Sequence, residues 1–222
     1  MVSTLIKDEK YSKLIKMALF LSLITIFYNI AEGLISIIFG LEDETLALLG
    51  FGIDSFVEVI SGLGILHMVL RMQYRMIEQR DSFERTALKI TGLSFYLLTA
   101  GLIFGIIINL INNTKPETTV VGIIISSISI ITMYLLVQAK LKVGNQLNSD
   151  AIIADANCTK TCFYLSFILL ASSLAYEIFK IGYLDIAGTI GIAIFAFREG
   201  KESFEKAKSN NLACSCGDNC HT

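Results

Sequence analysis

The chain has 222 residues, of which 54% are hydrophobic and 17% are charged, and its formal net charge is -2. The strongly positive mean hydropathy is unusual for a soluble domain of this length, so the composition predicts a membrane protein. Nothing in the placement of the charges predicts a nucleic-acid partner.

Six apolar runs follow one another along the chain, and most are near the roughly 20 residues that a membrane-spanning helix needs. The first run is too long for a removable signal peptide, and no small-residue cleavage site follows it. We therefore predict an all-α membrane protein with six transmembrane helices, in one domain over residues 1–205, followed by a flexible Cys-rich tail over 206–222. The apolar runs lie at about residues 13–40, 46–70, 86–112, 119–139, 149–176 and 182–198.

Lysine and arginine residues gather in alternate connections between these runs. Because connections rich in Lys and Arg stay on the cytoplasmic side, we predict that both termini are cytoplasmic in a multi-pass protein of the inner or plasma membrane. The other connections hold the acidic stretch Leu41–Thr45 and the single lysines Lys115 and Lys180. The basic positions are Lys7, Lys10, Lys13 and Lys16, then Arg71, Arg75, Arg80 and Arg85, then Lys140 and Lys142, and finally Arg198, Lys201, Lys206 and Lys208.

Two apolar runs each contain a pair of metal-ligating side chains. Asp54 and Glu58 lie in the second run, and Cys158 and Cys162 lie in the fifth. Spacing of i, i+4 places the members of each pair on one face of a helix. A carboxylate in hydrocarbon costs roughly 2.5 to 3.5 kcal/mol on insertion scales, so such residues are rarely kept inside a membrane without a role. These pairs predict a metal site within the membrane.

The depths of the two pairs agree. At about 1.5 Å per residue, the carboxylates lie roughly 12 and 18 Å below the outer end of the second run. The thiols lie roughly 13 and 20 Å above the inner end of the fifth run, so the pairs can meet near the middle of a ~30 Å core. Two oxygen and two sulfur donors would form the tetrahedral shell that suits Zn(II) or Cd(II) better than Mg(II).

The chain resembles the cation diffusion facilitators, a family of six-helix exporters of divalent metals, and the resemblance covers nearly its whole length. It implies a central site with Asp54 and Glu58 from the second helix and Cys158 and Cys162 from the fifth. The second carboxylate is Glu rather than Asp, and the Cys pair replaces a His/Asp pair. We expect a short branch that lacks the cytoplasmic C-terminal domain, because some twenty residues after the sixth run are too few for an independent core. The resemblance rests on Ala47–Glu58, on residues 139–162 and on Leu184–Ala187.

The tail carries three thiols and an imidazole close together, at Cys214, Cys216, Cys220 and His221. In a reducing cytosol these thiols are expected to stay reduced, which favours metal capture over a structural disulfide. The alternative is a flexible tail that binds metal only adventitiously, since the spacing C-x-C-x3-C-H matches no closed zinc motif.

Several further residues have two interpretations each. Asp155 could be a secondary metal ligand or proton acceptor, or could make ordinary hydrogen bonds at a helix start. Asn29 and Glu32 could form an access route or could hydrogen-bond a neighbouring helix. His67 could relay protons or simply pack. Residues 101–105 have GxxxG spacing, which marks a candidate face for a homodimer through transmembrane helices.

The ligand chemistry predicts metal/proton antiport. Thiols and buried carboxylates hold protons when the site is empty, and a divalent ion must displace those protons to bind. If the bundle exposes the site alternately to each side, the result is export of thiophilic ions from the cytoplasm. We expect metal ions, protons, the lipid bilayer and a second copy as partners, with no prosthetic group and no enzymatic activity. The alternatives are a membrane metal sensor or partner subunit that does not transport, and a thiol oxidoreductase, which would favour C-x-x-C near a membrane surface.

Overall fold

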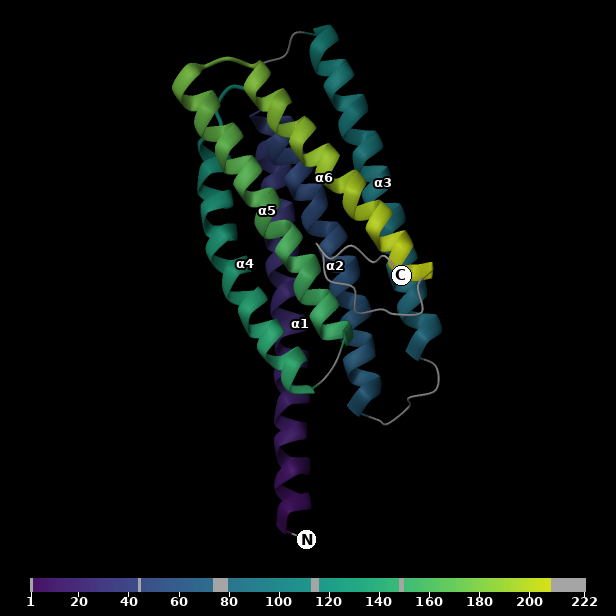
Figure 1. The fold of residues 1–222 in the computed structure, drawn as a ribbon. Coiled ribbons are helices and arrows are strands. Elements are labelled where there is room, and N and C mark those ends of the chain that lie inside the picture. The colour runs from purple at the N-terminus through teal and green to yellow at the C-terminus, as the bar shows by residue number, and fades with distance from the viewer. Residues whose placement is uncertain (1, 44, 74–79, 113–115, 148–149, 209–222) are drawn as a thin grey trace.

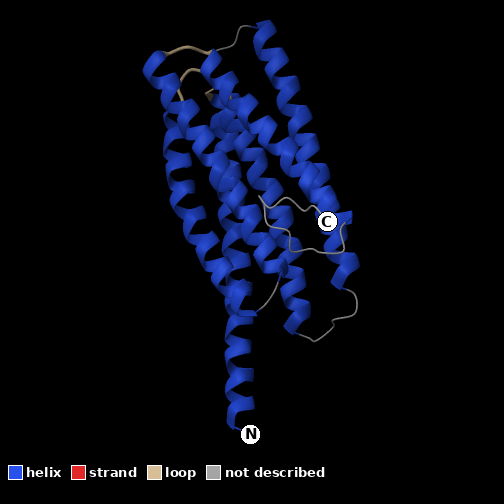
Figure 2. Cartoon of the chain, in the orientation of Figure 1, coloured by secondary structure: helices blue, strands red, loops and turns tan. Residues whose placement is uncertain are grey.

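The computed structural model describes residues 2–43, 45–73, 80–112, 116–147 and 150–208, and within these ranges all regular structure is helical (Figure 2). Apolar runs without internal proline produce long helices, since each backbone N–H can bond within its own segment. The helices are α1 (Val2–Glu42), α2 (Leu46–Gln73), α3 (Arg80–Asn112), α4 (Val120–Leu147), α5 (Asp150–Phe179) and α6 (Tyr183–Lys208).

Among the described residues, the five helices α1 to α5 are long and apolar enough to cross a bilayer. Helix α6 falls outside this group, because every 18-residue stretch of it holds at least three charged residues, among them Arg198 and Glu199. The prediction of an all-α, multi-pass membrane protein is confirmed, with five helices suited to span the bilayer. A sixth span through α6 stays a prediction.

Several helices extend well beyond the apolar runs that predict them, and α4 and α6 do so toward the basic residues that follow their runs. Helix α4 continues to Leu147, so Lys140 lies inside a helix rather than in a connection, which corrects its sequence assignment. Helix α6 continues past residue 205 to Lys208. The reason is that hydropathy marks only the embedded part of a helix, whereas Gln, Ala, Lys and Leu are good helix formers and extend it.

The helices run up and down, so that α1 begins and α6 ends toward the same end of the bundle (Figure 1). We call this the basic end, because the Lys- and Arg-rich segments lie there, and we call the opposite end the acidic end. The closest helix pairs are α1 with α2, α4 with α5, and α3 with α6. Helix α2 also packs against α3, α5 and α6, which makes it the central helix.

Buried apolar side chains form two clusters along the bundle. The cluster toward the acidic end joins α2, α3, α5 and α6, whereas the cluster toward the basic end joins α1, α2, α4 and α5. The first contains Ala47, Leu48, Phe51, Val57, Phe95, Leu98, Leu102, Leu165, Leu169, Ile192, Ala193 and Ala196. The second contains Ile15, Ala18, Leu21, Val69, Met133, Leu136, Val143, Ile152 and Cys162.

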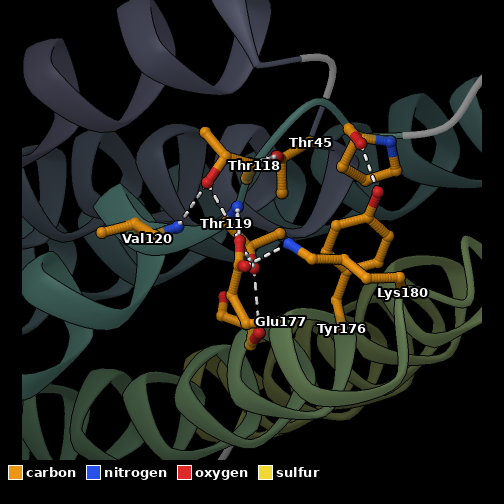
Figure 3. A network of polar contacts seen from close by, with 9 residues as sticks. Thr45, Thr118, Thr119, Val120, Tyr176, Glu177 and Lys180 are labelled. Carbon is orange, nitrogen blue, oxygen red and sulfur yellow. Dashed lines mark hydrogen bonds and ion pairs between the residues drawn. The ribbon is translucent and has the colours of Figure 1, made fainter.

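A polar network fastens the α3–α4 connection to the end of α5 (Figure 3). The Glu177 carboxylate accepts hydrogen bonds from Thr118 Oγ1 at 2.9 Å and from the backbone N–H of Thr119 at 2.7 Å. Lys180 forms an ion pair with the same carboxylate. Its φ of 52° is the left-handed conformation with which helices commonly end. The start of α4 is therefore held on the last turn of α5.

Two further bonds close the acidic end. The Tyr176 hydroxyl donates to the Pro116 carbonyl, and the Glu117 N–H donates to the Asp43 carbonyl at 3.0 Å. Partial burial, together with the nearby Glu117 and Glu42 carboxylates, raises the pKa of the Asp43 carboxyl above its usual value. The α1–α2 connection, the α3–α4 connection and the end of α5 are thus joined in one place.

The start of α2 is capped from another helix. Asp185 of α6 accepts hydrogen bonds from the backbone N–H groups of Leu46 at 2.9 Å and Ala47 at 3.4 Å. The first N–H groups of a helix have no partner within it, and a carboxylate there also favours the helix dipole. We expect Asp185→Ala to lower the free energy of unfolding by about 1 to 2 kcal/mol.

Thermal unfolding of the purified protein in detergent, followed by circular dichroism, measures this loss. Asp185→Asn keeps an acceptor oxygen and serves as the matched control, with a smaller expected decrease. If the Asp185→Ala protein unfolded at the wild-type temperature, Asp185 would not stabilise the start of α2.

Candidate metal site between α2 and α5

A pair of glycines brings α1 close to α2 next to the site. A Cβ built on Gly52 would lie 2.8 Å from Ser36 Cβ and 3.0 Å from the Gly33 carbonyl oxygen. Only glycine therefore fits at position 52 without moving backbone. This contact sets α1 against one side of α2, and Asp54, two residues later and so on the other side of the helix, meets Cys162 of α5.

Asp54 and Cys162 are in direct contact. The Cys162 Sγ donates a hydrogen bond to Asp54 Oδ2 at 3.3 Å, and the two residues are only 1% and 5% exposed. Within the described residues, Asp54 Oδ1 has no hydrogen-bond partner. These two positions, for which the sequence predicts one depth on α2 and α5, are thus in contact.

Glu58 lies one turn farther along α2, toward the basic end, and is 4% exposed. Its neighbours across the helix contacts include Cys162, Thr159 and Lys140. Neither Glu58 oxygen accepts a hydrogen bond from the described residues. A buried oxygen without a donor is costly, so these oxygens are suited to receive a cation.

Cys158 lies one turn before Cys162 on α5 and is half-buried, and both residues are thiols rather than disulfide sulfurs. In the part of the chain that the structure describes, no three His, Cys, Asp or Glu side chains lie close enough together to hold a metal ion. The structure thus joins Asp54 to Cys162 and places Glu58 beside them. The complete shell with Cys158 as a fourth ligand stays a prediction.

Asp155 is held by a lysine that sequence reasoning assigned to a connection. The Lys140 Nζ lies 2.8 Å from Asp155 Oδ2 and donates to Thr159 Oγ1 at 2.7 Å. The Lys140 and Asp155 side chains are 1% and 3% exposed, and Thr159 is fully buried. Asp155 therefore has a buried partner on α4. The helix-forming residues around Lys140 were the signal that α4 continues past the apolar run.

Glu32 contacts the neighbouring helix at the level of the site. The Tyr28 hydroxyl donates to Glu32 Oε1 at 2.9 Å, and Ser55 Oγ of α2 donates to Oε2 at 3.1 Å. Asn29, fully buried, donates from Nδ2 to the Thr25 carbonyl at 2.9 Å. Of the two interpretations of Glu32, hydrogen bonding to a neighbouring helix is the one that these contacts match.

The remaining candidates lie away from this centre. His67 is half-buried at the far end of the span in α2. Gly101 is exposed, and a Cβ built on it would meet nothing within 4 Å, whereas one on Gly105 would lie 3.3 Å from Leu46 Cδ2. The four ligands predicted in the tail, Cys214, Cys216, Cys220 and His221, lie outside the described residues.

Comparison with known proteins finds a distant relative. No family model matches the chain. The magnetosome protein MamB of Magnetospirillum gryphiswaldense is 23% identical to this chain over 175 residues, which is 77% of this chain and 58% of MamB. The chain thus spans less than two thirds of the length of the curated relative that it matches.

Proposed function

We propose that this chain transports divalent transition-metal ions through a site between α2 and α5. The similarity to MamB supports a relation to the cation diffusion facilitators, the family that the sequence resembles. The observation that carries the proposal is the buried contact between Asp54 and Cys162, from helices far apart in the sequence. Glu58 adds two buried oxygens without a donor among the described residues.

The donor set favours thiophilic ions such as Zn(II) and Cd(II), because thiolate is a soft ligand and carboxylate is a hard one. Binding requires deprotonated ligands, so metal entry releases protons, and protons that enter from the other side release the metal. We propose export from the cytoplasm by this exchange, with α6 as the sixth span and both termini cytoplasmic. A homodimer would form through the exposed face of α3 around Gly101.

Metal flux into proteoliposomes tests the proposal, with Zn(II), Cd(II), Co(II), Ni(II), Mn(II) and Fe(II) as substrates. We expect wild-type protein to move at least the softer ions. Cys158→Ser and Cys162→Ser should reduce Zn(II) and Cd(II) flux about tenfold or more and affect Mn(II) less, since a hydroxyl is a poor ligand for thiophilic ions.

Thr161→Ser is the matched control, because it is a mild change at a buried position of the same helix. Wild-type vesicles that take up none of these ions would refute transport. Binding without flux would instead indicate a sensor or partner subunit. Unchanged Cd(II) flux in both cysteine variants would refute ligation by sulfur.

A further inference from the structure

A lysine ammonium lies buried beside the proposed metal site. Lys140 is 1% exposed, and the two side chains that it contacts, Asp155 and Thr159, both come from α5. Burial of an ammonium is costly unless it is paired and hydrogen-bonded. The position of this charge is therefore set by α5, the helix that also carries Cys158 and Cys162.

A second carboxylate, Glu58 of α2, lies in the neighbourhood of this ammonium. Glu58 of α2 interacts electrostatically with both Lys140 and Asp155, and its oxygens have no hydrogen-bond donor among the described residues. A lysine stem is long and flexible, so its head group can move between neighbouring anions. In this structure the close ion pair is with Asp155.

We propose, on the basis of the proposed function, that Asp155 is a positioning residue that holds the Lys140 ammonium away from Glu58. Glu58 is then left with Asp54 to receive a divalent cation, and the combined charge of these two carboxylates matches that of the ion. Thr159 provides the second anchor for the ammonium. Asp155 accordingly acts through Lys140 rather than as the secondary metal ligand that was one of the two interpretations of its sequence position.

The proposal predicts a pattern of metal affinities in single and double variants that a ligand role of Asp155 would not produce. Without the Asp155 carboxylate, the ammonium pairs with Glu58 and competes with the metal. Removal of the lysine as well ends that competition. If Asp155 were a ligand, removal of Lys140 could not restore what Asp155 supplied.

Equilibrium binding of Cd(II) to the purified full chain, with thermal unfolding measured in parallel, tests this. We expect Asp155→Asn to weaken Cd(II) binding about tenfold or more, because the released Lys140 ammonium would then pair with Glu58. The size of the effect is that of one charge–charge interaction at an effective dielectric constant near 20. The double variant with Lys140→Gln and Asp155→Asn should bind Cd(II) with an affinity within about threefold of that of wild type. Asp155→Glu should bind Cd(II) like wild type, since it keeps the ion pair.

Three results would overturn the proposal. The double variant could bind as weakly as Asp155→Asn, which would make Asp155 a ligand. The affinity of folded Asp155→Asn could equal that of wild type while only its unfolding temperature falls, which would make the pair purely structural. Wild type could bind no Cd(II) at all, which would refute the metal site itself, whereas either of the first two results with active wild type leaves the proposed function standing.

Discussion

Asp54→Asn is expected to remove metal binding and transport while the protein stays folded. The asparagine has the same shape, and its carbonyl oxygen can still accept the hydrogen bond that Cys162 Sγ donates at 3.3 Å. Because a buried carboxylate without full pairing is costly, the neutral variant should be at least as stable as wild type. The substitution therefore removes only the negative charge that a bound cation needs.

The expected decrease in Cd(II) affinity is on the order of a hundredfold or more, because even groups that only support a ligand are worth about 10- to 100-fold. Binding and vesicle flux measure it, and thermal unfolding confirms that the variant is folded. Glu205→Gln makes the same change from carboxylate to amide at an exposed position of α6 and should leave both readouts unchanged. Wild-type flux through Asp54→Asn would mean that metal does not pass this residue.

Gly52→Val is expected to have the largest effect on folding. The new Cβ would lie 2.8 Å from Ser36 Cβ and 3.0 Å from the Gly33 carbonyl oxygen, and backbone cannot yield as a flexible side chain does. Overpacking of a tight contact costs about 1 to 3 kcal/mol and sometimes more. We expect Gly52→Val to lower the free energy of unfolding by about 3 kcal/mol, because α1 must move away from α2 along this contact.

Ala171→Val on α5 is the matched control, since Ala171 is exposed on another helix that is suited to span the bilayer. It introduces the same β-branched side chain into a membrane helix without the clash. The yield of folded protein and its unfolding temperature in detergent distinguish the two variants. Equal stability of both would show that α1 and α2 do not approach closely at Gly52.

The depth of the site could be predicted from the sequence because a helix rises by a constant amount per residue. Counting from the ends of two apolar runs was sufficient to bring Asp54 and Cys162 to one level, and they are in contact. The ends of the apolar runs, however, assigned Lys140 to a connection, whereas it lies inside α4. Hydropathy averages over a run and carries no information on whether a charged residue at its edge has a partner on another helix.

The polar contacts between distant segments could not be predicted from the sequence either, because the hydropathy of a segment does not identify its partners on other helices. Asp185 was part of the resemblance, but its bonds to the start of α2 depend on where α6 crosses that helix. Glu32 had two open interpretations until Tyr28 and Ser55 were seen to donate to it. Each of these side chains can reach many partners, and only the packing of the helices selects among them.

The sequence by itself determined the class of the protein, the order of its helices and the two segments that carry the candidate ligands, because hydrophobicity and helical periodicity are properties of consecutive residues. Only the tertiary structure decided that Asp155 pairs with Lys140, that Asp54 rather than Glu58 receives the hydrogen bond of Cys162, and that α1 meets α2 at glycines. These outcomes depend on the rotation and separation of neighbouring helices, which the packing of side chains from the whole bundle sets.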